Sequence, residues 1–341
     1  GGRVIRTGLI AAILTVQTAA QAAAGEIACA DAPEPVVALN YVSRYTDTDA
    51  NRATIDRRRE AEAEAAVAPL DDFIAMLAEG TEEMYAGGGK HRQAAANCVL
   101  DQMSAWAEAD ALSNLETETV RLTVGSRYAA FALVLWQTLP YAHDHPARGV
   151  VLAWLERRMN EQMAFWEVAA DGARQGNLRA WAGLAAAALA VQTEDARLRQ
   201  WAESAVKDVM CSANPDGSLP QEMRRGKYAL HYQLHAIAPL VTASALLERQ
   251  GIRASRACDK ALHRIVNFAV TDLHNGAKTA QITGKKQTLF DGSDRLKPFQ
   301  LAWIEPYLAL RRHKGLEKLQ KELAPLSYSK LGGNQTALWG R

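Results

Sequence analysis

The sequence has almost no excess charge of either sign. Lys and Arg together number 39 against 38 Asp and Glu, which gives a formal net charge of +1. A chain this close to neutral has no global field to attract a nucleic acid or an anionic membrane. Any site for an acidic ligand must therefore be a local basic cleft. We expect neither nucleic acid nor membrane as a partner.

Cysteine is also rare, with Cys29, Cys98, Cys211 and Cys258 as the only four. None forms a C-x-x-C pair and none lies beside a histidine at metal-ligand spacing, so we expect no metal and no cofactor. Four cysteines suit an exported protein with one or two disulfides. They allow three full pairings, which the sequence alone leaves open.

The apolar stretch near the start of the chain is too short to span a bilayer. It runs from Leu9 to Val16, follows Arg3 and Arg6, and leads into a run of small residues. This layout predicts a secretory signal peptide over residues 1–24 and hence a periplasmic protein. A buried amphipathic helix is the alternative interpretation.

Runs of β-branched residues are scarce, whereas alanine-rich segments with a helical period follow one another almost without pause. Hydrophobic residues make up 48% of the 341 residues, enough for a large core. We therefore expect a single all-α domain over residues 25–341. No repeat of fixed period is present, so helix hairpins would wind into a bundle or toroid. The predicted helices cover roughly residues 52–80, 92–109, 115–139, 146–167, 178–192, 195–211, 223–249, 254–273 and 298–313.

The segment between residues 214 and 240 holds the most informative pattern. A turn, N-P-D-G, precedes what reads as one helix over residues 223–249. Seven residues separate Arg225 from Tyr232, so at about 100° per residue the two share a face, two turns apart. A guanidinium on the same face as a phenol can stabilise the phenolate, which suits a tyrosine that moves protons. An ordinary amphipathic helix with a polar edge is the alternative.

Several short motifs lie along the chain in a fixed order: Ser43-Arg44-Tyr45 with Asp49 and Arg52-Ala53-Thr54, Met103-Ser104-Ala105-Trp106-Ala107, Arg225 with Ala229-Leu230 and Tyr232, Ala302-Trp303-Ile304-Glu305-Pro306-Tyr307, and Leu331-Gly332-Gly333. Together they resemble the alginate lyases of polysaccharide lyase family five, over nearly the whole mature chain. The resemblance implies an incomplete (α/α) toroid of helix hairpins around a central cleft. It also implies a periplasmic enzyme that cleaves acidic polysaccharides, and a disulfide between Cys29 and Cys98.

The resemblance implies a β-elimination in which Tyr232 removes the proton on C5 of a uronic acid and protonates the departing O4. The sugar carboxylate must be neutralised, because negative charge builds onto it. Asn177 is the candidate donor to that carboxylate. Arg225 is the candidate partner of the carboxylate or of the tyrosine.

One position departs from the family pattern. Where the family has N-N-H-x-Y-W, this chain has G-N-L-R-A-W, which keeps Asn177 and Trp181 but places Leu178 at the histidine. Leucine can neither take a proton nor donate to a carboxylate. We expect this change to relax substrate choice, from poly-mannuronate towards glucuronan or hyaluronan-like chains. Arg44 stands where the family has lysine, which keeps the charge but changes its geometry.

The remaining candidates are residues for substrate binding. Arg44 and Tyr45 match a segment that reaches the cleft in the family, and a histidine at position 231 or 235 can take the place of the missing one. A glycine triplet, residues 87–89, reads either as a mobile lid or as a simple connection. The full set of binding candidates is Arg44, Tyr45, Arg179, His231, His235, Tyr85, Lys90, Trp181 and Tyr307.

Three functions remain open at this level. The first is an exported, monomeric polyuronate lyase that cleaves within the polymer. The second is a non-catalytic polysaccharide-binding or export-associated protein on the same toroid, which lost activity together with the histidine. The third, a generic helical scaffold, is disfavoured by the ordered motifs.

Overall fold

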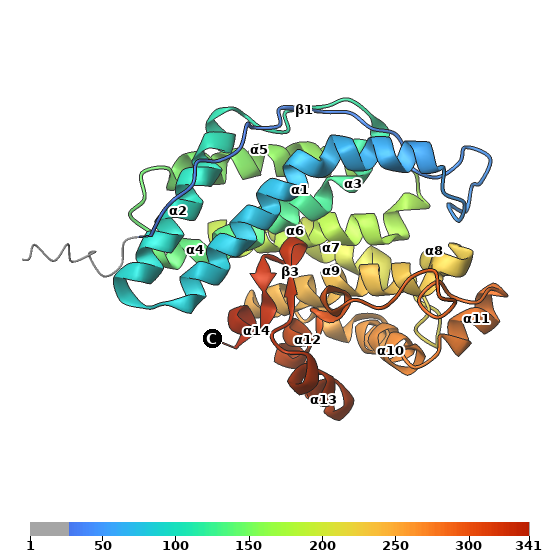
Figure 1. Cartoon of the computed structure of the whole chain (residues 1–341). Coiled ribbons are helices and arrows are strands. Elements are labelled where there is room, and N and C mark those ends of the chain that lie inside the picture. The colour runs from blue at the N-terminus through green and yellow to red at the C-terminus, as the bar shows by residue number, and fades with distance from the viewer. Residues whose placement is uncertain (1–26, 341) are drawn as a thin grey trace, which may run out of the picture.

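Helices form nearly all the regular structure of residues 27–340, the part of the chain that the computed structural model describes (Figure 1). The predicted signal peptide lies outside these residues. The helices are α1 (Arg57–Ala86), α2 (Gly89–Glu108), α3 (Glu118–Thr123), α4 (Gly125–Thr138), α5 (Arg148–Glu167), α6 (Asn177–Thr193), α7 (Ala196–Met210), α8 (Pro220–Met223), α9 (Ala229–Arg249), α10 (Ala257–Asp272), α11 (Ala277–Thr283), α12 (Ile304–Leu310), α13 (Lys314–Leu323) and α14 (Gln335–Trp339).

Most predicted helices are present, and the differences have local causes. Helix α1 starts five residues later than predicted, because the Asp56 carboxylate accepts the N–H groups of residues 58 and 59 and caps it. Such a cap stabilises a helix by about 1 kcal/mol. The helix predicted over 115–139 is divided at Val124 into α3 and α4. The prediction missed α8, α11, α13 and α14, which are short.

Helix α6 lies at the centre of the molecule, packed against α4, α7 and α9. Its sequence is alanine-rich, and the side chains from Arg179 to Ala190 are all buried. Small residues let the neighbouring helices approach closely. A Cβ on Gly125 of α4 would lie 2.9 Å from the backbone nitrogen of Ala182, so only glycine fits at this crossing.

The other helices surround α6 as hairpins of neighbours in sequence. Helices α1 and α2 pack together, as do α6 and α7, and α9 contacts both α10 and α12. The C-terminal segment then returns to the N-terminal half, where β4 (Gly333–Asn334) packs on α1 (Figure 1). The prediction of an all-α fold of helix hairpins is confirmed.

The extended segments are short and tie distant parts of the chain together. Strand β1 (Ala38–Leu39) pairs parallel with β2 (Asn114–Leu115), and β3 (Ser327–Tyr328) pairs antiparallel with β4. Two disulfides are present, Cys29–Cys98 and Cys211–Cys258. The first is the pairing that the family resemblance implies.

The segment between β1 and α1, residues 40–56, is an ordered loop. Tyr45 and Ile55 form an isolated antiparallel bridge, which brings the two sides of the loop together. The Asp49 carboxylate accepts the N–H groups of Asn51 and Ala53 at 3.0 and 2.8 Å. These contacts hold the loop in a defined shape above the N-terminal ends of α6 and α9.

Candidate active site

A cleft of ≈ 320 Å³ opens where this loop meets the helical body. Its walls come from segments far apart in the sequence: the loop, α1, α3, α4, the first turn of α6, the start of α9, and the C-terminal segment. Cationic side chains dominate the lining. They are Arg44, Arg52, Arg127, Arg225 and Lys330, against the carboxylates Glu60, Glu64 and Asp71. In a chain with a formal charge of only +1, this is the local basic cleft that an acidic ligand requires.

Tyr232 lies in the first turn of α9 with its phenol in the cleft. Arg44 donates a hydrogen bond from Nη2 to the Tyr232 oxygen at 2.6 Å. The Tyr45 hydroxyl contacts the same oxygen. The guanidinium of Arg225 lies over the Tyr232 ring, 4.0 Å from its centre. We call these four residues the tyrosine wall.

The tyrosine wall differs from the sequence prediction in one respect. Arg225 does not belong to the helix of Tyr232, because α9 begins only at Ala229 and a 3-10 turn, η3 (Gly226–Tyr228), separates them. Gly226 has φ +58°, a left-handed conformation that interrupts the helix. The prediction of one helix over 223–249 is therefore wrong. Arg225 and Tyr232 nevertheless meet, through stacking of the guanidinium on the ring rather than along a shared helix face.

Burial governs the protonation of the second phenol. It raises the pKa of Tyr45 far above the ordinary tyrosine value, and the neighbouring Tyr232 raises it further. The charges of Arg44 and Arg225 oppose this rise. Tyr45 is therefore a protonated hydrogen-bond donor beside the Tyr232 oxygen at neutral pH.

Asn177 and Leu178, in the first turn of α6, line the same cleft, and we call them the α6 side. The amide of Asn177 is held by a buried carboxylate, Glu222, which accepts its Nδ2 at 3.1 and 3.3 Å and its backbone N–H at 2.8 Å. Leu178 packs beside the small apolar cluster of Leu122 and Trp166. At the position of the family histidine, the cleft therefore has an apolar surface.

The two candidate histidines both line the cleft, and both are neutral at pH 7. Burial lowers the pKa of His231 to about 4, with further lowering by Arg44. Burial also places the pKa of His235 well below its usual value. His235 Nε2 accepts a hydrogen bond from the indole N–H of Trp181 at 3.1 Å, so this nitrogen carries no proton.

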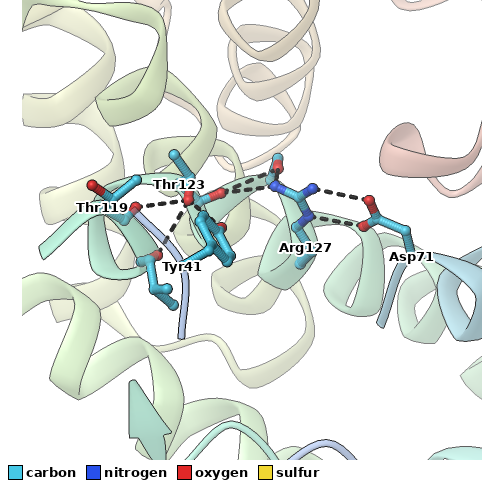
Figure 2. A network of polar contacts seen from close by, with 7 residues as sticks. Tyr41, Asp71, Thr119, Thr123 and Arg127 are labelled. Carbon is cyan, nitrogen blue, oxygen red and sulfur yellow. Dashed lines mark hydrogen bonds and ion pairs between the residues drawn. The ribbon is translucent and has the colours of Figure 1, made fainter. Parts of the chain in front are cut away.

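A polar network continues from the cleft into the helical body (Figure 2). The hydroxyls of Tyr41 and Thr123 share a hydrogen bond, and Arg127 donates to the backbone carbonyl of Thr123 at 3.2 Å. Arg127 also donates to both carboxylate oxygens of Asp71, at 2.9 and 3.0 Å. The network thereby joins the start of the loop to α3, α4 and α1.

Lys330 lines the cleft close to this network, and the sequence prediction missed it. Burial, together with the charges of Arg127 and Arg44, lowers the pKa of Lys330 to about 7. Asp71 acts in the opposite direction. Lys330 directly precedes the matched Leu331-Gly332-Gly333 motif, which was the available signal. Glu222 was also missed, although it lies only three residues before Arg225.

Five predicted binding residues do not line the cleft. Arg179 is buried on another side of α6, paired with Asp208 at 3.2 Å and stacked against Trp201. The phenol of Tyr307 is buried in the core and shares a hydrogen bond with His263. Trp181 acts indirectly, as the donor to His235.

The glycine triplet is a short connection between α1 and α2, and not a lid over the cleft. Tyr85, before it, donates to Gln137 at 3.0 Å, and Lys90 is exposed in the first turn of α2. The loop that does cover the cleft, residues 40–56, contains no glycine. Glycine content was therefore a poor guide to the covering segment.

The described residues contain no cluster of three or more His, Cys, Asp or Glu side chains that could hold a metal ion. Within residues 27–340, no helix is both long and apolar enough to span a bilayer.

Known proteins resemble this chain in sequence. The family model "Alginate lyase" matches residues 130–279, which include Asn177, Arg225 and Tyr232. An alginate lyase of Pseudomonas syringae pv. syringae is 27% identical over 323 residues, covering 91% of this chain and 82% of the relative. A polysaccharide lyase of Stenotrophomonas maltophilia is 27% identical over 330 residues, covering 93% and 92%.

Solved structures agree with these relatives in fold. Alginate lyase A1-III from Sphingomonas species A1 superposes with a TM-score of 0.74 at 24% identity, covering 92% of this chain and 87% of that one. A Tyr-to-Phe variant of alginate lyase A1-III in complex with a tetrasaccharide has a TM-score of 0.75 at 25% identity, with the same coverage. The fold is therefore the α/α toroid. Family model, relatives and structures together confirm the predicted resemblance to the alginate lyases and indicate a polysaccharide lyase enzyme.

Proposed function

We propose that the cleft depolymerises alginate-type polyuronates by β-elimination, with Tyr232 as the group that moves the protons. The observation that carries this proposal is the position of the Tyr232 oxygen. It lies in a basic cleft, hydrogen-bonded to Arg44 at 2.6 Å and in contact with the Tyr45 hydroxyl. Arg44 donates to this oxygen and the Tyr45 hydroxyl can donate to it, and such donors stabilise negative charge that develops during a reaction.

In the proposed reaction, the Tyr232 phenolate takes the proton from C5 of the uronic acid. The C4–C5 double bond then forms, the bond from C4 to the glycosidic O4 breaks, and O4 receives the proton from Tyr232. One residue can perform both transfers where the C5 proton and O4 lie on the same face of the sugar. Tyrosine O–H acid–base catalysis of this kind contributes roughly 10²–10⁴-fold to the rate.

Negative charge builds onto the sugar carboxylate when the C5 proton leaves, so a neutralising group must lie beside it. Arg225 and Asn177 border the cleft next to Tyr232 and are the proposed partners. Arg225 keeps one buried nitrogen, Nη1, without a hydrogen-bond partner among residues 27–340. A buried guanidinium N–H without a partner is costly, and a bound carboxylate would satisfy it.

We further propose a broad substrate range, because the α6 side offers the apolar Leu178 where the family has histidine. Poly-mannuronate, glucuronan and hyaluronan-like chains are the proposed substrates. A non-catalytic polysaccharide-binding protein is the alternative, which the loss of the histidine would favour.

Product formation separates these possibilities, because the unsaturated uronate that β-elimination produces absorbs in the ultraviolet. We expect the purified protein to generate this absorbance on at least one polymer of a panel of polyuronates. We expect the variant Tyr232→Phe to lose about 10³-fold or more of kcat while it still binds polymer. No product on any polymer would exclude the lyase, and full activity of the variant would exclude the role of Tyr232.

We also propose that the protein is exported to the periplasm and acts as a monomer. Two disulfides, Cys29–Cys98 and Cys211–Cys258, suit an oxidising compartment. Cell fractionation and gel filtration of the processed chain test these two points separately.

A further inference from the structure

The carboxylate of Glu222 has no part in the chemistry described so far, yet it contacts a residue that borders the substrate. Its side chain is 0% exposed. Oε1 accepts the backbone N–H of Asn177 at 2.8 Å, and Oε2 accepts the Asn177 amide nitrogen Nδ2 at 3.1 Å. A carboxylate buried to this extent requires strong partners.

Part of its role is to complete the N-terminus of α6. The residue before this helix, Gly176, has no side chain to cap it. The first N–H groups of a helix need acceptors, and the helix dipole favours an anion there. Glu222, which lies in α8, supplies both a hydrogen-bond acceptor and a negative charge at this helix end. This contact favours the charged form of the carboxylate.

The orientation of the Asn177 amide conflicts with the proposed substrate. Its nitrogen faces Glu222, and its carbonyl oxygen Oδ1 is buried without a hydrogen-bond partner in the described chain. The carbonyl oxygen can only accept hydrogen bonds, and an ionised uronate carboxylate can also only accept them. In this orientation the carbonyl has no bond to offer a carboxylate.

A proton on Glu222 removes this conflict. Oε1 can keep the backbone N–H of Asn177, while a hydrogen on Oε2 donates to Oδ1 once the amide turns by half a rotation. The turn places Nδ2, a donor, at the position that Oδ1 held, in a residue that lines the cleft. The proton comes from solvent, and no bond between heavy atoms changes.

We propose that Glu222 is a proton-linked positioning residue: binding of a uronate carboxylate in the cleft is coupled to protonation of Glu222, which turns Asn177 from acceptor to donor. This inference rests on the proposed function, because the ligand is the uronate substrate. The proposal adds Glu222 to the site, and it requires that one proton is taken up when one uronate binds beside Asn177.

The surrounding charges support the coupling. Burial raises the pKa of Glu222, and the positive charge of Arg225 opposes this rise. A substrate carboxylate that pairs with Arg225 adds a negative charge nearby and so raises the pKa of Glu222 further. The pocket beside Asn177 and α8 is also lined by Arg52, Arg224 and the carboxylate of Glu118. Helices α9 and α11, which pack against α8, carry the titratable side chains His231, Tyr232, His235 and Lys278. Among the charged groups, Arg225 opposes protonation of Glu222 most strongly.

Calorimetric proton counting tests the proposal. The ligand is a mannuronate tetrasaccharide, and the background is Tyr232→Phe, so that the sugar is bound but not consumed. Titration in buffers of different ionisation enthalpy, from about pH 5 to about pH 8, gives the number of protons taken up on binding. We expect Glu222→Gln on this background to lower the maximal uptake by close to one proton. Glutamine can hold Asn177 in the donating orientation without a proton.

The affinity provides a second readout that a purely structural role would not move. We expect the Tyr232→Phe affinity to fall by up to tenfold per pH unit above the pKa of Glu222, and the Glu222→Gln double variant to lose that slope. Lys330 contributes equally to both proteins, so its own titration cancels. The matched control is Glu305→Gln on the same background. Glu305 is a buried carboxylate that accepts from Gln320 and Thr336, away from the cleft.

Equal proton uptake and equal slopes with and without Glu222→Gln would overturn the proposal. If that variant does not fold, infrared difference spectroscopy of Tyr232→Phe alone replaces it. A new carbonyl band of a protonated carboxyl on tetrasaccharide binding supports the proposal, and its absence overturns it. Failure of the proposed function is seen separately, as absence of ultraviolet product from the unsubstituted protein.

Discussion

The tyrosine wall and the α6 side of the cleft present different chemical groups to an acidic ligand. The tyrosine wall packs two phenols and two guanidinium groups into mutual contact, with Arg44 donating to Tyr232 at 2.6 Å. The α6 side has one amide, already held by Glu222, beside an apolar leucine. The guanidinium groups of this comparison therefore all lie on one side, and the other side presents one amide and an apolar surface. Under the proposed function, the tyrosine wall carries the proton transfers and the α6 side sets the substrate range.

Removing charge from the tyrosine wall should have the largest effect. Arg44→Gln deletes a charged donor to the Tyr232 oxygen, and such hydrogen bonds contribute about 1.5–3 kcal/mol. We expect kcat/KM to fall by roughly 10- to 100-fold, mainly through kcat. The control is Arg312→Gln, which removes a guanidinium from an exposed side chain. A loss in KM alone would show that Arg44 binds substrate without assisting the tyrosine.

Adding a polar group to the α6 side should reduce the difference between the two sides. Leu178→His restores a donor at the position where the family has one. We expect the ratio of kcat/KM for poly-mannuronate over glucuronan to rise by about tenfold, the scale of one added hydrogen bond. Leu178→Met, which keeps the side apolar, is the matched control. An unchanged ratio would mean that Leu178 does not set the substrate range.

A third change tests the charge of Lys330, which lines the cleft but belongs to neither the tyrosine wall nor the α6 side. Lys330, with a pKa of about 7, is charged below that pH and neutral above it. If it attracts the polyanion, KM should rise several-fold from about pH 6 to about pH 8, and Lys330→Met should have a high KM with a smaller rise, because only the contribution of Glu222 remains. Initial rates at fixed ionic strength measure it. A KM that rises equally in both proteins would assign the titration to another group.

The same lysine makes a prediction for stability with a definite sign. Its pKa is lower in the folded chain than in the unfolded one, so the unfolded chain binds more protons between about pH 7 and about pH 10. The contribution of Lys330 to the free energy of unfolding therefore rises with pH across this window. Urea unfolding of the Lys330→Met variant should lack that rise.

The smallest expected effect lies outside both sides, in the network of Figure 2. Thr123→Val keeps the shape but removes the hydroxyl that Tyr41 contacts. One such hydrogen bond contributes about 1 kcal/mol, so a small decrease in the urea midpoint is expected, with kcat nearly unchanged. A large loss of activity would show that the network controls the position of the loop above the cleft.

The sequence predicted the helices and the tyrosine wall well, because both leave local signals. Helical periodicity marks α6 and α9, and ordered motifs mark Arg44, Tyr45, Arg225 and Tyr232. The binding residues were harder. Arg179 and Tyr307 have the right chemistry, but burial against Asp208 and His263 removes them from the cleft.

The sequence prediction missed Glu222 and Lys330 because packing of the helices, and not a sequence pattern, brings them to the site. Their roles depend on contacts with residues distant in sequence, and no local pattern reports these. Glu222 reads as one more acidic residue in a short helix until α6 is packed against it. Lys330 reads as a surface lysine until the C-terminal segment returns to α1 and α4. Neighbours in the sequence predict helices and strands, whereas a functional site depends on how these helices and strands pack together.

The return of the C-terminal segment has a consequence for how the protein is made. Arg44 and Lys330 lie near opposite ends of the described chain, yet they line one cleft and the charge of Arg44 lowers the pKa of Lys330. Such a distant contact forms late, because the entropy of closing the intervening chain must first be overcome. A nascent chain can therefore bury its central helix while its catalytic centre is still incomplete. Under the proposed function, activity depends on both ends of the described chain, and we expect a chain cut short before residue 330 to be inactive.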